Sequence, residues 1–351
     1  MREHLCLIMD DCETLGGVQL MTLDTARVLR KAGYRVTMVC RSLGGWLAER
    51  LAGELAGVRV VRRRSYGITT VDMALDYVQG APRDCGLSIN MHGDVQPIVS
   101  DVVYFHQFNV DYRYLSGGPR ARALLSLQQY LRRKFVERLK EAGAVVLVNS
   151  NFTRAEASYF WGLRDVRVVY PPVHVERYSN WGPADAREDR VVTVRRLDDY
   201  VLGLVKRLAA RLSRYEFVVA GSVKDVRGLR ELRALPPNVR VLPNVSEEVK
   251  SELLRSSKVY LNANPFVEGF GIAVVEGMAA GDVPVTRAVG GPLDYAPREF
   301  MFSKVDEIPE KVAEAMESWS PGLAEEMREI AGKFSVERYE AELLDVIVRL
   351  L

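Results

Sequence analysis

The chain of 351 residues is too long for one ordinary core and has about the length of two domains. Its hydrophobic content of 48% and charged content of 27% are typical of a globular protein and exclude a largely disordered one. The formal net charge is only +2, so the overall balance gives no reason to expect nucleic acid as a partner.

Four cysteines, Cys6, Cys12, Cys40 and Cys85, are scattered without a Cys-x-x-Cys pair. We therefore expect reduced thiols, as in a cytosol, rather than a disulfide framework or a zinc site. No stretch approaches 18 consecutive apolar residues, and the N-terminus does not resemble a signal peptide. The expected location is cytoplasmic, or peripheral on the cytosolic face of a membrane.

Apolar runs alternate with helical patterns along the first half of the chain, which predicts parallel βαβ units. A helix is expected over 19–32. Strands are expected at 5–9, 34–40, 58–61, 87–90, 102–105, 144–148 and 166–169. The pair Pro171-Pro172 cannot continue a helix or a central strand, and so marks a boundary.

A second series follows the polar stretch 178–189. Its strands are expected at 191–194, 216–220, 239–242, 259–261 and 283–285. Two such series predict an α/β protein with two Rossmann-like, doubly wound parallel-sheet domains that face a cleft. The expected domains are 1–172 and 173–333, with a closing helix over 334–351 that returns to the first domain.

The glycines Gly16 and Gly17 lie in the loop after the first strand. Ligands of open α/β sheets bind at the carboxyl ends of strands, and glycine lets the backbone approach a diphosphate closely. A tight turn is the alternative interpretation. The dinucleotide fingerprint Gly-x-Gly-x-x-Gly is absent here, which argues against an NAD enzyme.

His106 directly follows the predicted strand 102–105 and is therefore expected at the same edge of the sheet. Its imidazole can donate or accept a hydrogen bond there, or relay a proton. A purely structural histidine is the alternative. His92, one strand earlier, is a weaker candidate, and Ser150 or Asn151 can cap the helix that follows the strand 144–148.

The segment 120–140 has a helical pattern with seven basic residues against Glu137 alone. Its apolar residues form one stripe: Leu124, Leu127, Leu131, Phe135 and Leu139. Such a helix can lie on an anionic membrane, or it can pack on the first domain's sheet with its charges in water.

Arg196 lies just past the predicted strand 191–194, again at a carboxyl end. A guanidinium binds phosphate oxygens bidentately and stays charged, so Arg196 is a candidate phosphate ligand. Two surface arginines, Arg195 and Arg196, in a variable loop are the alternative.

The most informative segment reads Glu268-Gly-Phe-Gly-Ile-Ala-Val-Val-Glu276. Two carboxylates flank a glycine turn, Gly269-Phe270-Gly271, which leads into an apolar helix starting near Ile272 without a capping side chain. The unpaired N–H groups and the helix dipole there favour a phosphate, while the carboxylates can accept hydrogen bonds from sugar hydroxyls.

This Glu-x7-Glu spacing resembles the signature of the family 4 retaining glycosyltransferases, which have the GT-B fold. The flanking segments 265–267, 281–285 and 290–292 resemble that family as well. Segments 89–94 and 170–173 resemble the branch of mannosyltransferases that extend dolichol-linked glycans.

The resemblance implies a hexosyltransferase that moves a hexose from a nucleotide diphosphate sugar, of the GDP-mannose or UDP-glucose type, to an acceptor hydroxyl with retention. The acceptor would be a sugar or a lipid-linked glycan. It implies catalytic roles for His106, Arg196 and Glu268. The implied donor-binding residues are Gly16, Gly17, Arg196, Glu268, Gly269, Phe270, Gly271, Ile272 and Glu276.

Within these roles, Glu276 would hold the ribose and Glu268 the transferred sugar. No essential metal and no other cofactor is expected, and the adjacent Asp10 and Asp11 are interpreted as solvated charges. The family's lysine five residues after the arginine is replaced by Val201, and its glycine before the arginine by Arg195. A non-catalytic homologue that binds nucleotide sugar as a partner subunit is therefore the alternative function.

Overall fold

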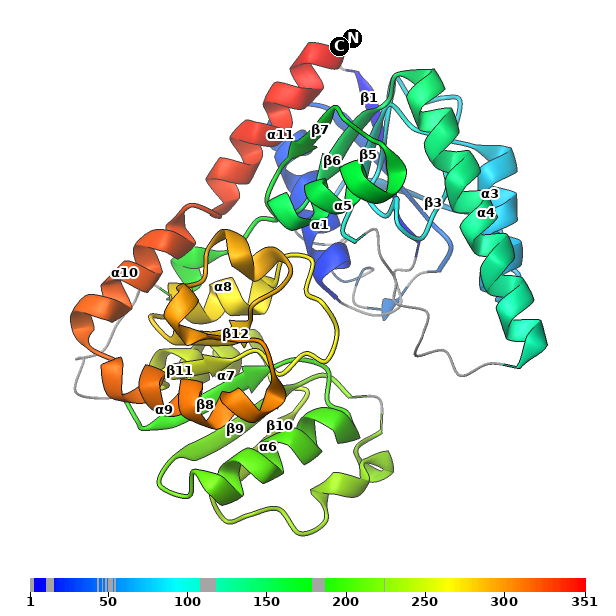
Figure 1. Ribbon diagram of the computed structural model, residues 1–351. Coiled ribbons are helices and arrows are strands. Elements are labelled where there is room, and N and C mark those ends of the chain that lie inside the picture. The colour runs from blue at the N-terminus through cyan, green and yellow to red at the C-terminus, as the bar shows by residue number, and fades with distance from the viewer. Residues whose placement is uncertain are drawn as a thin grey trace. The chain divides into compact units, whose positions relative to one another are not determined.

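A computed structural model describes residues 3–10, 16–42, 44–45, 47, 49, 53, 55–107, 118–178, 187–223 and 225–351. The chain divides into two compact units. Unit 1 comprises Met1–Pro171 together with Tyr339–Leu351, and unit 2 comprises Pro172–Arg338. Each unit is a parallel sheet covered by helices (Figure 1).

Unit 1 has a seven-stranded sheet in its described part, in the order β3-β2-β1-β4-β5-β6-β7. Every pairing in it is parallel. The strands are short apolar runs because a parallel sheet is buried on both faces. They are β1 (His4–Ile8), β2 (Arg35–Cys40), β3 (Arg59–Arg62), β4 (Leu87–Asn90), β5 (Val102–Phe105), β6 (Val145–Val148) and β7 (Val166–Val168).

The helices of unit 1 cover both faces of this sheet. They are α1 (Gly17–Lys31), α3 (Thr69–Gln79), α4 (Pro119–Ala142), α5 (Asn151–Trp161) and the greater part of α11 (Val336–Leu350). Helices α1 and α11 share one core with alternate residues of β1, β2 and β4, whereas α4 and α5 pack on the opposite face of β5 and β6 (Figure 1). The hydroxyls of Thr25 and Tyr339 hydrogen-bond at 2.6 Å, which joins α1 to α11.

The described part of unit 2 has a six-stranded parallel sheet in the order β10-β9-β8-β11-β12-β13. The strands are β8 (Arg190–Val194), β9 (Glu216–Gly221), β10 (Val239–Pro243), β11 (Val259–Leu261), β12 (Val283–Arg287) and β13 (Met301–Phe302). All twelve predicted strands are present within two residues of the expected positions. The two-residue strand β13 was not predicted, because so short a run carries no periodic signal.

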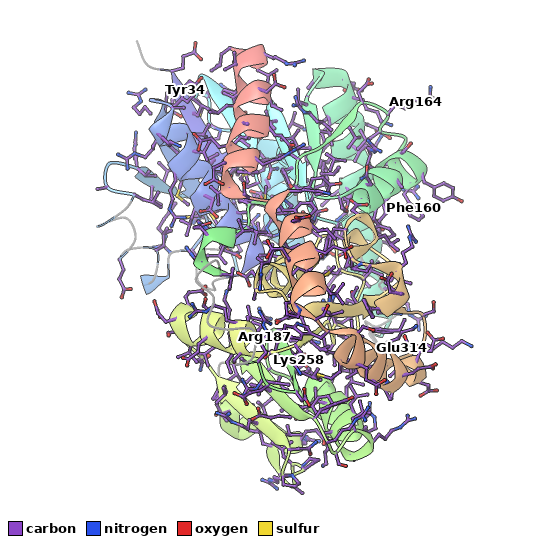
Figure 2. The ribbon with its side chains drawn as sticks, turned by 90° about the vertical axis from the view of Figure 1, so that its left-hand side faces the viewer. Tyr34, Phe160, Arg164, Arg187, Lys258 and Glu314 are labelled. Atoms are coloured by element: carbon purple, nitrogen blue, oxygen red, sulfur yellow. A yellow bond between two sulfur atoms is a disulfide. The ribbon has the colours of Figure 1, made fainter. Side chains whose placement is uncertain are left out.

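The helices of unit 2 also lie on both faces of its sheet. They are α6 (Asp199–Arg211), α7 (Glu247–Ser256), α8 (Ile272–Ala279), α9 (Ile308–Ser318) and α10 (Pro321–Gly332). Short 3-10 turns include η2 (Val175–Tyr178) and η6 (Gly291–Asp294). Helices α6 and α9 share one core with the sheet, and α8 packs between the sheet and α10. Arg187 and Lys258, which precede the neighbouring strands β8 and β11, lie close together (Figure 2).

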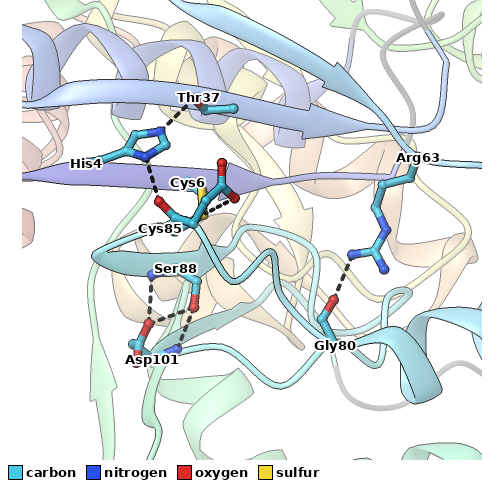
Figure 3. Close-up of a disulfide and its surroundings, with 9 residues drawn as sticks. His4, Cys6, Thr37, Arg63, Gly80, Cys85, Ser88 and Asp101 are labelled. Carbon is cyan, nitrogen blue, oxygen red and sulfur yellow. Dashed lines mark hydrogen bonds between the residues drawn. A yellow bond between two sulfur atoms is a disulfide. The ribbon is translucent and has the colours of Figure 1, made fainter.

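The expectation of reduced cysteines is wrong for Cys6 and Cys85, which form a disulfide (Figure 3). The parallel register pairs Leu5 with Leu87 and so brings Cys85, just before β4, beside Cys6 on β1. Their Cα atoms are 5.8 Å apart, within the usual range for a disulfide. Cys40 is buried and is not part of this disulfide, and Cys12 lies outside the described residues.

Candidate active site

Several of the predicted donor-binding residues lie in unit 2, near the topological switch point of its sheet. At this point β8 and β11 are neighbours, although two strands, β9 and β10, come between them in the sequence. Open α/β sheets bind ligands at the carboxyl ends of strands at this point. The loop after β8 carries Arg195 and Arg196, and the loop after β11 leads to Glu268. The fold therefore brings these two sequence-predicted segments to one edge of the sheet.

Helix α8 begins at Ile272 without a side-chain cap. Its N-cap is Gly271, whose φ of +95° lies in the left-handed region that favours glycine. Glu268 lies before this turn, and Glu276 lies one turn inside the helix. The helix start therefore keeps backbone donors and a positive dipole end available between two carboxylates.

Two glycines of the loop after β12 allow that loop to pack directly on the turn before α8. The N–H of Gly291 donates to the carbonyl of Glu268 at 2.8 Å. A Cβ atom on Gly290 would lie 2.2 Å from that carbonyl oxygen, and one on Gly291 would lie 2.3 Å from the oxygen of Gly269. Only glycine fits at these two positions, so the Gly290-Gly291 pair holds the turn in place.

Three aromatic rings pack under the same turn. Phe270, Tyr295 and Phe334 meet edge to face with ring centroids 5.3–5.5 Å apart. The Tyr295 hydroxyl donates to the carbonyl of Phe270 at 2.7 Å. Phe270 is thus buried, and its ring supports the turn before α8.

Glu268 is held by a neighbouring amide. The Nδ2 of Asn264 donates to its Oε2 at 2.7 Å. Burial raises the pKa of Glu268, although the Asn264 hydrogen bond and the positive charge of Arg195 oppose that rise. The carboxylate is therefore oriented by the protein and lies in a place of low polarity, where a hydrogen bond to a ligand hydroxyl is stronger than in water.

The two adjacent arginines differ in surroundings. Arg195 donates to the carbonyl of Ala263 at 2.9 Å and to the carboxylate of Asp198 at 2.8 Å, which ties the end of β8 to the loop after β11. Arg196 is exposed, and its guanidinium donates to no atom of the described residues. Sequence reasoning chose Arg196 and missed the bracing contacts of Arg195.

The two other positions discussed near Arg196 lie elsewhere. Val201 is fully buried in the core of unit 2, and its backbone N–H donates to the carboxylate of Asp198, the N-cap of α6. Lys206 forms an ion pair with Glu231 at 3.3 Å. Val201 thus carries no charge, and the charge of Lys206 is paired within the chain.

Glu276 is engaged by two side chains that sequence reasoning missed. The ammonium of Lys250, on α7, lies 2.9 Å from its Oε1. The hydroxyl of Tyr178, in η2, also hydrogen-bonds to it. The signal for Lys250 was its place on an otherwise apolar helical face, but only the fold shows that α7 lies beside α8.

In unit 1, Gly16 is the N-cap of α1 and Gly17 its first residue, again without a side-chain cap. The neighbouring Asp10 does not remain solvated as expected, because its carboxylate pairs with Arg41. Arg41 also pairs with the buried Asp76, whose pKa burial raises to about 6. Asp11 lies outside the described residues.

His106 follows β5 at the carboxyl edge of the unit 1 sheet. Its Nε2 lies 2.8 Å from the carbonyl of Met91, and since a carbonyl only accepts, this nitrogen carries the proton. Burial lowers the pKa of His106 despite the carboxylate of Asp94. The ring is therefore neutral at pH 7, with Nδ1 as an acceptor.

The ring of His92 and the side chain of Asn149 contact His106. The ring of His92 lies edge-on at 6.0 Å, and the Nδ1 of His92 is buried with no hydrogen-bond partner in the described part of the chain. The Nδ2 of Asn149 donates to the carbonyl of His106 at 2.9 Å. Ser150 caps α5 by accepting from the N–H of Thr153 at 3.1 Å, which matches the capping interpretation.

The apolar stripe predicted over 120–140 divides into two parts on α4. Leu131, Phe135 and Leu139 are buried against the sheet. Leu124 and Leu127 are 47% and 45% exposed, and Arg122 beside them is exposed as well. The packing interpretation thus holds for the C-terminal half of the helix, whereas the N-terminal half presents apolar and basic side chains to the surroundings.

No helix in the described ranges is both long and apolar enough to cross a membrane. The same residues contain no group of three or more His, Cys, Asp or Glu side chains arranged to hold a metal ion.

Comparison with solved structures defines the class of the fold. HepE from Anabaena, in complex with UDP-glucose, matches with a TM-score of 0.73 over 99% of this chain and 100% of that chain, at 13% identity. The lipopolysaccharide glycosyltransferase WaaG matches with a TM-score of 0.70 over 98% and 99% of the two chains, at 15% identity. The chain has the GT-B fold of glycosyltransferases, as predicted.

Sequence comparison narrows this class. Residues 184–334 match the family described as Glycosyl transferases group 1 and form a domain of that family. Similar curated proteins are GDP-Man:Man(3)GlcNAc(2)-PP-Dol alpha-1,2-mannosyltransferases. The Caenorhabditis elegans protein is 27% identical over 43% of this chain and 37% of its own length, and the Xenopus laevis protein is 26% identical over 66% and 54%. The chain thus spans about half the length of these relatives or less.

Proposed function

We propose that this chain is a retaining hexosyltransferase that uses a nucleotide diphosphate sugar of the GDP-mannose or UDP-glucose type. One observation carries the proposal: an uncapped helix start lies between an oriented Glu268 and a clamped Glu276, at the switch point of the unit 2 sheet. The curated relatives favour GDP-mannose as the donor and a lipid-linked glycan as the acceptor.

The residues of the site have distinct roles in this proposal. Glu276 accepts hydrogen bonds from the ribose, and Glu268 accepts them from the transferred sugar. The start of α8 and Arg196 stabilise the charge that develops on the departing diphosphate, which is usually the largest catalytic contribution in such a site. In unit 1, Gly16-Gly17 adds backbone donors to the diphosphate, and the neutral His106 orients a sugar hydroxyl. The acceptor proton leaves toward the departing phosphate, without a protein nucleophile, an essential metal or another cofactor.

A thermal-shift panel of GDP, UDP, ADP and TDP tests donor binding, because a ligand that binds only the folded state raises its melting temperature. One nucleotide should stabilise the protein more than the others, and its mannose or glucose conjugate should then be turned over. Full activity in the presence of a chelator is expected. Activity that the chelator abolishes and Mg²⁺ or Mn²⁺ restores would contradict the metal-independent mechanism.

A second candidate function follows from Val201, which is buried where the family carries a lysine. In this alternative the chain binds nucleotide sugar but does not transfer it, and serves as a partner subunit. Calorimetry combined with a donor hydrolysis assay separates the two functions. Binding without turnover for every donor tested would favour the non-catalytic subunit.

We further propose that the N-terminal half of α4 contacts an anionic membrane surface, where a lipid-linked acceptor would be found, with the protein on the cytosolic face. Leu124 and Leu127 supply exposed apolar area and Arg122 supplies charge. Co-sedimentation with anionic liposomes should occur at low salt and weaken at high salt. The Cys6–Cys85 disulfide requires, in addition, a cell whose cytosol permits disulfides, as in some hyperthermophiles.

A further inference from the structure

Lys250 is an almost buried lysine whose ammonium contacts two carboxylates. Its residue is 9% exposed. The Nζ atom lies 2.9 Å from Oε1 of Glu276 and 2.8 Å from Oε2 of Glu247. Burial by itself would lower the pKa of Lys250, but the two carboxylates outweigh burial and raise it. The side chain is therefore a permanent cation against Glu276.

Glu276 has a second protein donor on the same carboxylate group. Tyr178 is buried, and its hydroxyl hydrogen-bonds to Glu276. A carboxylate offers about four acceptor positions. Two of them are thus occupied by the protein, and the Glu276 side chain remains 12% exposed. The remaining acceptor positions suit a pair of neighbouring hydroxyls.

We propose that Lys250 is a positioning residue for the donor nucleotide: it holds the Glu276 carboxylate in one orientation, so that Glu276 can accept hydrogen bonds from the ribose hydroxyls. This inference rests on the proposed function of the unit 2 site. An ion pair that only stabilised the fold would need no exposed acceptor on Glu276, and its loss would weaken all nucleotides equally.

The test compares a ribonucleotide with its 2′-deoxy analogue. Calorimetry with GDP and dGDP, and with UDP and dUDP, is carried out on the wild type and on Lys250→Met, which keeps the side-chain length without the charge. We expect the wild type to prefer the ribonucleotide about tenfold, the size typical of one hydrogen bond to a charged group. In Lys250→Met this preference should fall close to unity, while Lys250→Arg should restore most of it.

A matched control is Lys258→Met, since Lys258 pairs with Asp189 at 2.6 Å and has no contact with Glu276 among the described residues. It should keep the wild-type preference. If Lys250→Met does not fold, Lys250→Gln replaces it. Glu276→Gln should lose the ribose preference, and adding Lys250→Met to Glu276→Gln should cause no further loss.

The outcomes are distinguishable. A tenfold ribose preference that persists in Lys250→Met or Lys250→Gln would overturn the role of Lys250 and leave the proposed function intact. A wild type that binds none of these nucleotides would overturn the proposed function, and with it the role of Lys250. Equal weakening of ribo- and deoxyribonucleotides in the variant would assign Lys250 to stability alone.

Discussion

Cys6 and Cys85 are joined by a disulfide although 79 residues separate them in the sequence. The bond connects the inner strand β1 to the segment that enters β4 (Figure 3). The neighbouring His4 braces the same segment, because one ring nitrogen lies 2.9 Å from the carbonyl of Asp84 and the other lies 2.8 Å from Thr37. The two strands that meet at the topological switch point of unit 1 are therefore cross-linked.

The first prediction concerns this cross-link. Closing a loop of this length restricts the unfolded chain, and the loop-entropy relation gives a stabilisation of about 4.5 kcal/mol. Reduction with dithiothreitol should therefore lower the melting temperature of the wild type by several degrees. The double variant Cys6→Ala/Cys85→Ala should melt at a temperature close to that of the reduced wild type, with and without reductant. A reductant effect that persists in this variant would show that the cross-link is not its cause.

The second prediction concerns the buried ion pair of Arg187 and Asp282. Nη1 of Arg187 lies 2.8 Å from Oδ1 of Asp282, and both side chains are at most 4% exposed. Figure 2 shows Arg187 next to Lys258, and both cations lie over the ring of Trp319. Asp282→Ala leaves the Arg187 charge buried without its carboxylate, which costs about 3–5 kcal/mol.

The control is a more exposed ion pair, the one between Lys258 and Asp189. Asp189 is 59% exposed, so Asp189→Ala should cost about 1 kcal/mol or less. Urea unfolding of both variants measures the difference. Equal losses of stability would contradict the contrast between a buried and an exposed pair.

The strands and the glycine turn before α8 could be predicted from the sequence, because their signals are local. A parallel strand is an apolar run, and an uncapped helix start is visible as the absence of Ser, Thr, Asp or Asn before an apolar helix. The Gly290-Gly291 pair was also visible as a motif. Its reason, the close approach to the backbone of Glu268 and Gly269, required the fold.

The partners of the site residues could not be predicted, because they depend on which helices lie side by side. Lys250 meets Glu276 only because α7 and α8 cover the same face of the sheet. The apolar stripe of α4 is buried in only one half of the helix for a similar reason. Its stripe is continuous in sequence, but the sheet is shorter than the helix and covers only Leu131, Phe135 and Leu139. The disulfide depends on the register of β1 with β4.

The third prediction concerns Gly291. In Gly291→Ala the new methyl group would lie 2.3 Å from the carbonyl oxygen of Gly269, a backbone atom that has to move. We expect a loss of about 1–3 kcal/mol in stability and a weaker affinity for the nucleotide, because the turn before α8 shifts. Gly332→Ala is the control, since a methyl group there would meet no described atom within 4 Å beyond its own helix and chain neighbours. Unchanged nucleotide affinity in Gly291→Ala would argue against a role for this turn in binding.

The fourth prediction separates the two adjacent arginines. Arg196 is exposed and has no described partner, so Arg196→Ala should leave the melting temperature unchanged and lower kcat roughly a hundredfold, as for the loss of one transition-state donor. Arg195 donates hydrogen bonds to the carbonyl of Ala263 and to the carboxylate of Asp198, so Arg195→Ala should lower the melting temperature. Turnover that survives in Arg196→Ala would assign the phosphate contact to another residue.

The fifth prediction uses the pKa of Glu268, which burial raises above the ordinary value of 4.5. The ionised carboxylate accepts hydrogen bonds from the donor sugar more strongly than the protonated acid does, so donor affinity should fall on acidification at a higher pH than an exposed glutamate would cause. Because the folded protein then holds this proton more tightly than the unfolded chain does, protonation of Glu268 favours folding as the pH falls. As the pH falls, protonation of Glu268 should therefore weaken donor binding while it increases the free energy of unfolding.

Calorimetry of the nucleotide sugar between pH 4 and 8 measures the first effect, and Glu268→Gln identifies the group. The variant should bind the donor more weakly at pH 7 and should lack the acidic loss of affinity, because a glutamine amide does not titrate. Arg195→Ala should move the same loss to a still higher pH, since the positive charge of Arg195 opposes the rise in the pKa of Glu268. If the acidic loss of affinity is the same in Glu268→Gln as in the wild type, a different group titrates and Glu268 does not hold the transferred sugar.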